Sequence, residues 1–218
     1  MTKSVYIVVR HAHSEKNLGA GINTSEEDPE KPYHLTPQGH REAMQTGAEI
    51  AAMFQRVDSI VSSPLYRARE TAAIIINYVG TSTQQAESEL LTDIHFGKWD
   101  GTTDAKMPKD WRELPEKYGI ETDEHMRQRV AGFLESYSED GVHVVVSHKE
   151  WIRGAIAVDE GCSIVDIIRR EQLPETDGGI RIPRASITLI DYRRQEGDRV
   201  VFIGKTEVPK EFKPMALF

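Results

Sequence analysis

The chain has 218 residues, of which 39% are hydrophobic and 28% charged, and its formal net charge at pH 7 is −8. These proportions are typical of a globular protein with one large domain, and the negative charge argues against nucleic-acid binding through a general basic field. The single cysteine, Cys162, excludes an intrachain disulfide and a cysteine-rich metal site. Because no apolar run reaches the length of a membrane span and no signal-peptide core is visible, we expect a cytoplasmic protein without a membrane partner.

Strands and helices are predicted to alternate along the first part of the chain. A short apolar run rich in β-branched residues is typical of a buried strand, and a Thr-Pro pair is typical of a helix start. The predicted elements are, in order, a buried strand at 5–9, a polar loop at 18–35, a helix capped by Thr36 that ends near Phe54, a strand at 59–62, and a helix that follows Ser63-Pro64 and ends near Gly80.

The second part continues the alternation and ends in a predicted antiparallel pair. Its elements are an irregular segment at 89–104, helical patterns at 111–117 and 124–137, a buried strand at 143–147, helices at 150–158 and 163–170, a Gly-rich link around Gly178, and alternating runs at 185–192 and 199–204 joined by a turn at 196–198. We find no repeat and no linker. The sequence therefore predicts one domain over residues 1–218, with 18–35 and 102–137 as insertions at the rim of a pocket and a peripheral tail from Val208.

Three buried strands each lead into a helix, and polar residues stand at each transition. Arg10-His11 follows the first strand, Ser63 and then Arg67 follow the second, and His148 follows the third. In parallel βαβ units these positions meet at one edge of the sheet, where ligands bind. A phosphate dianion would offset the repulsion among so many buried cations. Taken alone, His11 could equally cap a strand while Arg10 forms a surface ion pair.

The motifs at these positions resemble, in order, those of the histidine phosphatase superfamily, which includes the cofactor-dependent phosphoglycerate mutases. The matching stretches are Arg10-His11 with Asn17 (Arg-His-Gly-Glu and a downstream Asn), Leu35–Gly39 (Leu-Thr-x-x-Gly), residues 62–72 around Arg67, residues 93–101 (Glu-x-x-x-Gly-x-Trp-Glu-Gly), residues 145–148 with Ile152-Arg153, and residues 185–188. Each stretch alone is weak evidence, but all of them occur in the family's order over about residues 5–204, and together they are strong evidence. The resemblance implies an α/β fold: three αβα layers around a mostly parallel central sheet, as in phosphoglycerate mutase.

The resemblance also implies a role for each matching residue. His11 would be the nucleophile that forms a phosphohistidine, and Asp93 the general acid and then the base. Phosphoryl oxygens would be bound by Arg10, Asn17, Arg67 and His148, and by the backbone N–H of Lys149. No metal and no cofactor is implied. Asp93 could instead be a capping carboxylate in its Gly-rich loop, and Arg67 could lie on a solvated helix face.

Several positions depart from the family pattern. Ala12 and His13 replace Gly and Glu of the first motif, and Lys149-Glu150 replaces the usual Gly-Gly after the second histidine. We expect the last change to crowd the pocket rim and to affect the choice of substrate. Asp93 stands where Glu is usual, and aspartate is intrinsically the stronger acid. A pH optimum on the acid side is therefore predicted.

Three functions remain open at this point. The first is a metal-independent phosphomonoesterase of the histidine acid phosphatase type, which converts a small phosphorylated metabolite to an alcohol and inorganic phosphate. The second is a phosphoglycerate mutase, and the third is an inactive phospho-ligand binding module. Hydrolysis is favoured because residues 102–137 contain no paired arginines to hold a second phosphate. The run at 199–204 predicts a sheet edge that could support a homodimer.

Overall fold

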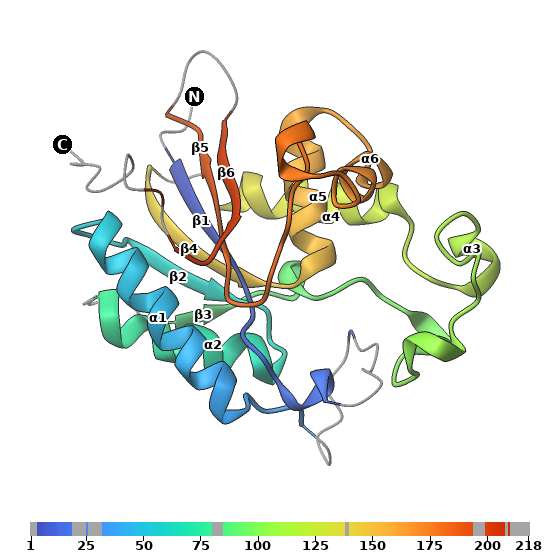
Figure 1. Ribbon diagram of the computed structural model, residues 1–218, viewed down its shortest axis with the longest axis horizontal. Coiled ribbons are helices and arrows are strands. Elements are labelled where there is room, and N and C mark those ends of the chain that lie inside the picture. The colour runs from blue at the N-terminus through green and yellow to red at the C-terminus, as the bar shows by residue number, and fades with distance from the viewer. Residues whose placement is uncertain are drawn as a thin grey trace.

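The computed structural model describes residues 4–18, 25, 32–79, 85–137, 140–193, 199–207 and 209. Six strands of this part form one sheet in the order β3-β2-β4-β1-β5-β6 (Figure 1). Their bounds are β1 (Ser4–Arg10), β2 (Ser59–Ser62), β3 (Gln85–Glu87), β4 (Gly141–Ser147), β5 (Ile187–Asp191) and β6 (Val200–Lys205). The first four strands pair in parallel, β5 is antiparallel to β1, and β6 is antiparallel to β5. The prediction of a mostly parallel sheet is confirmed.

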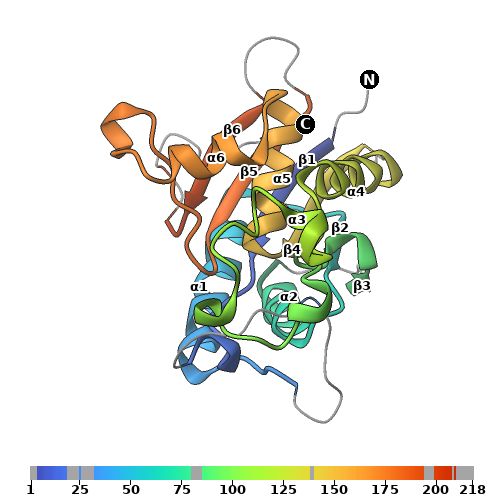
Figure 2. The same cartoon turned by 90° about the vertical axis from the view of Figure 1, so that its right-hand side faces the viewer.

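Helices cover both faces of the sheet. The helices are α1 (Pro37–Met53), α2 (Tyr66–Val79), α3 (Pro115–Tyr118), α4 (Asp123–Ser136), α5 (Lys149–Glu160) and α6 (Ile164–Arg170). In Figures 1 and 2, α1 and α2 lie on one face, while α4 and α5 lie on the other. The two faces therefore carry separate hydrophobic cores, as expected of a three-layer αβα fold.

Alternate residues of β1 contribute to the two cores. Ile7 packs in the cluster that contains side chains of α1 and α2, whereas Tyr6 and Val8 belong to the cluster with Phe133 of α4 and Trp151 of α5. A strand that is buried on both faces needs apolar residues at every position. This requirement explains the uninterrupted apolar run that marked the strand in the sequence.

The parallel register brings the carboxyl ends of three strands level. Arg10 at the end of β1 pairs with Ser147 at the end of β4, and Ser62 at the end of β2 pairs with Val146. The residues that follow these strands therefore emerge at the same edge of the sheet, as predicted.

The start of α1 is tied to the loop after β1. Thr36 caps the helix by accepting a hydrogen bond from the Gly39 N–H (3.2 Å) on its side-chain oxygen. A Cβ atom on Gly39 would lie 1.9 Å from the carbonyl oxygen of His13. This close approach requires glycine, and it places the start of α1 directly beside the loop that follows His11.

The structure departs from the predicted elements at two places. The helix predicted at 111–117 is confined to α3, which begins at Pro115, because a residue before proline disfavours the helical conformation. The short strand β3 was not predicted, since its sequence Gln-Ala-Glu is polar and the strand lies at the sheet edge. The predicted turn at 196–198, the tail from residue 210 and most of the loop at 18–35 lie outside the described residues.

Within the described part of the chain, no helix is both long and apolar enough to pass through a membrane. Strand β6 forms the edge of the sheet opposite β3. The homodimer and the single-domain organisation stay predictions.

Candidate active site

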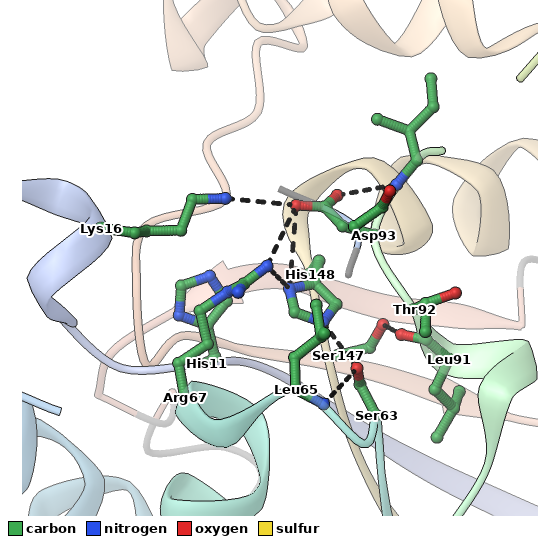
Figure 3. A network of polar contacts seen from close by, with 12 residues as sticks. His11, Lys16, Ser63, Leu65, Arg67, Leu91, Thr92, Asp93, Ser147 and His148 are labelled. Carbon is green, nitrogen blue, oxygen red and sulfur yellow. Dashed lines mark hydrogen bonds and ion pairs between the residues drawn. The ribbon is translucent and has the colours of Figure 1, made fainter. Parts of the chain in front are cut away.

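His11 lies directly after β1 with only 2% of its surface exposed (Figure 3). Its Nδ1 lies 2.8 Å from the carbonyl oxygen of Ala12. Because a carbonyl oxygen can only accept a hydrogen bond, Nδ1 carries the proton and the neutral ring keeps a lone pair on Nε2. An imidazole in this tautomer is prepared to act as a nucleophile.

The surroundings of His11 hold the ring neutral. Burial lowers the pKa of His11 well below its ordinary value, and the positive charges of Arg67, Arg10 and Lys16 lower it further. Protonation would place another positive charge among these cations without water to solvate it. His11 is therefore unprotonated at neutral pH, as nucleophilic attack requires.

His148 follows β4 as the N-cap of α5, and its ring centroid lies 5.2 Å from that of His11. The fully buried Arg67 donates a hydrogen bond from Nη2 to Nδ1 of His148 (3.2 Å). Nδ1 is thus the acceptor, so the proton resides on Nε2, which donates to Oγ of Ser63 (2.9 Å). Burial, followed by the charge of Arg67, lowers the pKa of His148 well below its ordinary value.

Asp93 faces the cluster of His11, Arg67 and His148. It lies in the segment after the short 3₁₀ helix η2 (Glu89–Leu91). Its Oδ2 lies 3.8 Å from Nη2 of Arg67 and 3.8 Å from Nδ1 of His148. Its Oδ1 accepts a hydrogen bond from the backbone N–H of Ile94 (3.1 Å). The local turn thus uses one oxygen and leaves the other directed at the cluster (Figure 3). This arrangement suits a group that exchanges a proton with a bound substrate.

Two long-range contacts hold the segment that carries Asp93. Ser147, the last residue of β4, donates a hydrogen bond from its hydroxyl to the carbonyl oxygen of Leu91 (2.7 Å). Arg129 of α4 donates to the carbonyl oxygens of Thr92 (2.8 Å) and Asp93 (3.2 Å) and pairs with Glu121 (2.8 Å). Asp93 is therefore positioned by the strand that also positions His148.

Arg10 approaches from the end of β1. Its Nη1 donates to the carbonyl oxygen of Ile182 (2.7 Å), and within the described residues its buried Nε has no hydrogen-bond partner. Burial, and then the charge of Arg184, lowers the pKa of Arg10 to about 10, with Asp93 acting in the opposite direction. Arg10 therefore remains a cation at neutral pH and keeps a donor for an incoming anion.

Asn17 and Lys149, which the sequence predicts to bind phosphate, contact other protein groups in the structure. Asn17 lies in the 3₁₀ helix η1 (Glu15–Asn17), and its Oδ1 accepts hydrogen bonds from the backbone N–H (3.0 Å) and the hydroxyl (3.2 Å) of Ser14. The ammonium of Lys149 lies 2.6 Å from Oε2 of Glu171. The backbone N–H of Lys149 is at the first position of α5, where helix N–H groups lack partners within the helix. Both phosphate-binding roles stay predictions.

Three residues that differ from the family motifs, Ala12, His13 and Glu150, form hydrogen bonds or ion pairs with neighbouring residues. The N–H of Ala12 donates to Oγ1 of Thr71 (3.1 Å), and the N–H of His13 donates to Glu42 (2.8 Å). Glu150 pairs with Arg112 (2.7 Å) from the predicted rim segment and with Arg153 of α5.

Lys16 also belongs to the group of charged side chains around His11 and Asp93, although its sequence position did not predict this. Its Nζ lies 3.7 Å from Oδ2 of Asp93, and only 12% of its side chain is exposed. A basic residue in the polar stretch directly after the Arg-His pair was the available signal. No three or more metal-ligating side chains are grouped to hold an ion in the described part of the chain.

The model of the histidine phosphatase superfamily (branch 1) matches residues 6–202. "Putative phosphoserine phosphatase 2" of Hydrogenobacter thermophilus is 29% identical over an alignment 215 residues long, which covers 93% of this chain and 96% of the relative. The 2,3-bisphosphoglycerate-dependent phosphoglycerate mutase of Bradyrhizobium diazoefficiens is 27% identical over an alignment 191 residues long, which covers 78% of this chain and 88% of the relative. Among solved structures, the phosphoserine phosphatase of Entamoeba histolytica in complex with 3-phosphoglyceric acid has a TM-score of 0.69 at 22% identity, over 93% of this chain and 97% of that one. The family match spans most of the sequence and includes every strand end that forms the site, so the chain belongs to the histidine phosphatase superfamily (branch 1).

Proposed function

We propose that this protein is a metal-independent phosphomonoester hydrolase that acts on a small phosphorylated metabolite through a phosphohistidine intermediate. The observation that carries the proposal is the tautomer of His11: a buried, neutral imidazole whose unprotonated Nε2 lies among cations. Arg10 and Arg67 supply the positive charge that a phosphoryl dianion requires.

In the first step, Nε2 of His11 attacks phosphorus and the bond between phosphorus and the ester oxygen breaks. Asp93, in its acid form, gives its proton to the departing oxygen, which leaves as the alcohol. Arg10 and Arg67 stabilise the charge on the phosphoryl oxygens, and His148 can donate to one of them after a change of hydrogen-bond partner.

In the second step, the carboxylate of Asp93 removes a proton from a water molecule that attacks phosphorus. The bond between phosphorus and His11 breaks, inorganic phosphate leaves, and the neutral imidazole is restored. Asp93 is again protonated, so protons balance over the cycle. The same residue acts as acid and then as base, which its position beside the cluster permits.

Hydrolysis is preferred over the mutase reaction because the arginines after the acid already have partners. In the described residues of 102–137, Arg112 pairs with Glu150, Arg127 lies 3.6 Å from Glu124, and Arg129 pairs with Glu121. Arg112 and Arg129 are thus held by carboxylates, so they do not form a pair that could bind a second phosphate. The names of two relatives, both phosphoserine phosphatases, support a small phosphorylated substrate.

The test is hydrolysis of p-nitrophenyl phosphate from pH 5 to pH 8, with and without EDTA, by the wild type and by His11→Ala. We expect turnover that EDTA does not change and that His11→Ala abolishes. Absence of turnover by the wild type would refute the hydrolase. An assay of 3-phosphoglycerate isomerisation would then separate a mutase from a binding module.

A further inference from the structure

The side chain of Lys16 turns into the pocket. Lysines at a protein surface usually extend the ammonium into water, but only 12% of the Lys16 side chain is exposed. In Figure 3 it extends above His11 in this view and points at Asp93, which lies above His148. The ammonium therefore lies at the cluster that contains His11 and His148, close enough for its charge to act on both rings.

This placement is electrostatically unfavourable for the protein by itself. The pKa of Lys16 is lowered to about 8, mainly by burial and then by the charges of Arg67 and Arg10, while Asp93 and Asp100 act in the opposite direction. Lys16 in turn lowers the pKa values of His11 and His148. A cation that repels two arginines contributes little to folding, so its position requires another explanation.

The contact with Asp93 does not supply a complete explanation. Oδ2 of Asp93 is approached by Lys16 (3.7 Å), Arg67 (3.8 Å) and the Nδ1 of His148 (3.8 Å). One carboxylate therefore faces two full positive charges. Once Asp93 carries the proton that it donates to a leaving group, it no longer offsets the charge of either cation. A phosphoryl dianion would balance both.

We propose that Lys16 is a phosphate-binding residue of this site, which exchanges Asp93 for a phosphoryl oxygen when the substrate binds. The inference rests on the proposed function and extends it. It adds Lys16 to the phosphate-binding residues that the sequence predicts, among them its neighbour Asn17.

The test compares Lys16→Met, which keeps the length without the charge, with Lys16→Arg, which keeps the charge. Lys205→Met is the matched control, since Lys205 lies on the edge strand β6. The dissociation constant of inorganic phosphate is measured by calorimetry, and kcat/KM is measured with p-nitrophenyl phosphate and with an alkyl phosphate. Because loss of one preorganised charge-stabilising group costs about 10²-fold in rate, we expect Lys16→Met to lower kcat/KM by about that factor and to weaken phosphate binding. Lys16→Arg should retain most of both, and the control should change neither.

A role in binding phosphate predicts an equal loss for both substrates. A role exerted only through Asp93 predicts a loss with the alkyl phosphate alone, because p-nitrophenolate leaves without a proton, and that result would overturn the inference. Phosphate binding by Lys16→Met within twofold of the wild type would also overturn it. A merely structural role predicts a lower melting temperature for Lys16→Met, whereas removal of a buried cation beside two arginines should leave it unchanged or raise it.

The pH profile gives an independent readout. Lys16 is charged below pH 8 and neutral above it, so kcat/KM of the wild type should fall as the pH rises through about 8. Lys16→Arg should move this fall to higher pH, because arginine stays protonated. If the wild type binds phosphate but hydrolyses no ester, the proposed function fails while the binding comparison still decides the role of Lys16.

Discussion

Two buried neutral histidines should make this protein progressively less stable as the pH falls below 6.5. His11 and His148 are 2% and 0% exposed, and the pKa of each lies well below its ordinary value. In the unfolded chain each ring binds a proton near pH 6.5, whereas the folded protein cannot accept it. The unfolded state then binds more protons than the folded state, so the free energy of unfolding decreases as the pH falls.

The magnitude follows from the titration of the unfolded chain. Between pH 6.5 and pH 5.5 the proton uptake of one unfolded histidine amounts to about 1 kcal/mol, so the two rings together remove about 2 kcal/mol from the free energy of unfolding. Above pH 7.5 both rings are neutral in both states, and this contribution is constant. The carboxyl groups with a lowered pKa, such as Glu150 and Glu171, act at lower pH.

The assay is urea unfolding at pH 7.5, 6.5 and 5.5 for the wild type and for His11→Asn, with His125→Asn as control. His125 is exposed on α4. We expect His11→Asn to halve the loss between pH 6.5 and 5.5 and the control to equal the wild type. A free energy of unfolding that is constant over this interval, or a loss that His11→Asn does not reduce, would refute the reasoning that the rings are held neutral.

Three further predictions concern the acid and the segments that support the site. Asp93→Asn should lower kcat/KM, which reports only the steps up to the phosphohistidine, by about 10²–10⁴-fold for alkyl phosphates and far less for p-nitrophenyl phosphate; equal losses of kcat/KM would argue against proton donation. Arg129→Leu leaves the buried carboxylate of Glu121 without its partner, so urea unfolding should show a loss of about 3–5 kcal/mol, and a loss below about 1 kcal/mol would contradict that view. Gly39→Ala places a methyl group 1.9 Å from the carbonyl oxygen of His13, so thermal unfolding should show a lower melting temperature, while an unchanged one would mean that the loop can move aside.

Much of the fold could be predicted because its signals are local. An apolar, β-branched run identifies a strand that is buried on both faces, and the Thr-Pro pair identifies the start of α1. The strand ends then converge because parallel βαβ units have one handedness. The cluster of His11, Arg67 and His148 follows from these rules, and the structure brings these residues together.

Other features could not be read from local sequence. Strand β3 has a polar sequence, and its extended conformation is stabilised by parallel pairing with β2. The helix predicted at 111–117 shortened to α3 because the constraint before Pro115 outweighed the helical pattern. A pattern of apolar residues describes neither of these effects.

The sequence by itself determined which chemical groups stand at the ends of the strands. The tertiary structure alone decided how those groups act on one another. The proton on Nδ1 of His11 depends on the carbonyl oxygen of Ala12, and the proton on Nε2 of His148 depends on Arg67 and Ser63. Likewise, the ammonium of Lys16 lies beside the carboxylate of Asp93, which is far along the chain. Tautomers, buried charges and ion pairs are set by distances of a few ångströms between segments that are remote in sequence, and only folding establishes those distances.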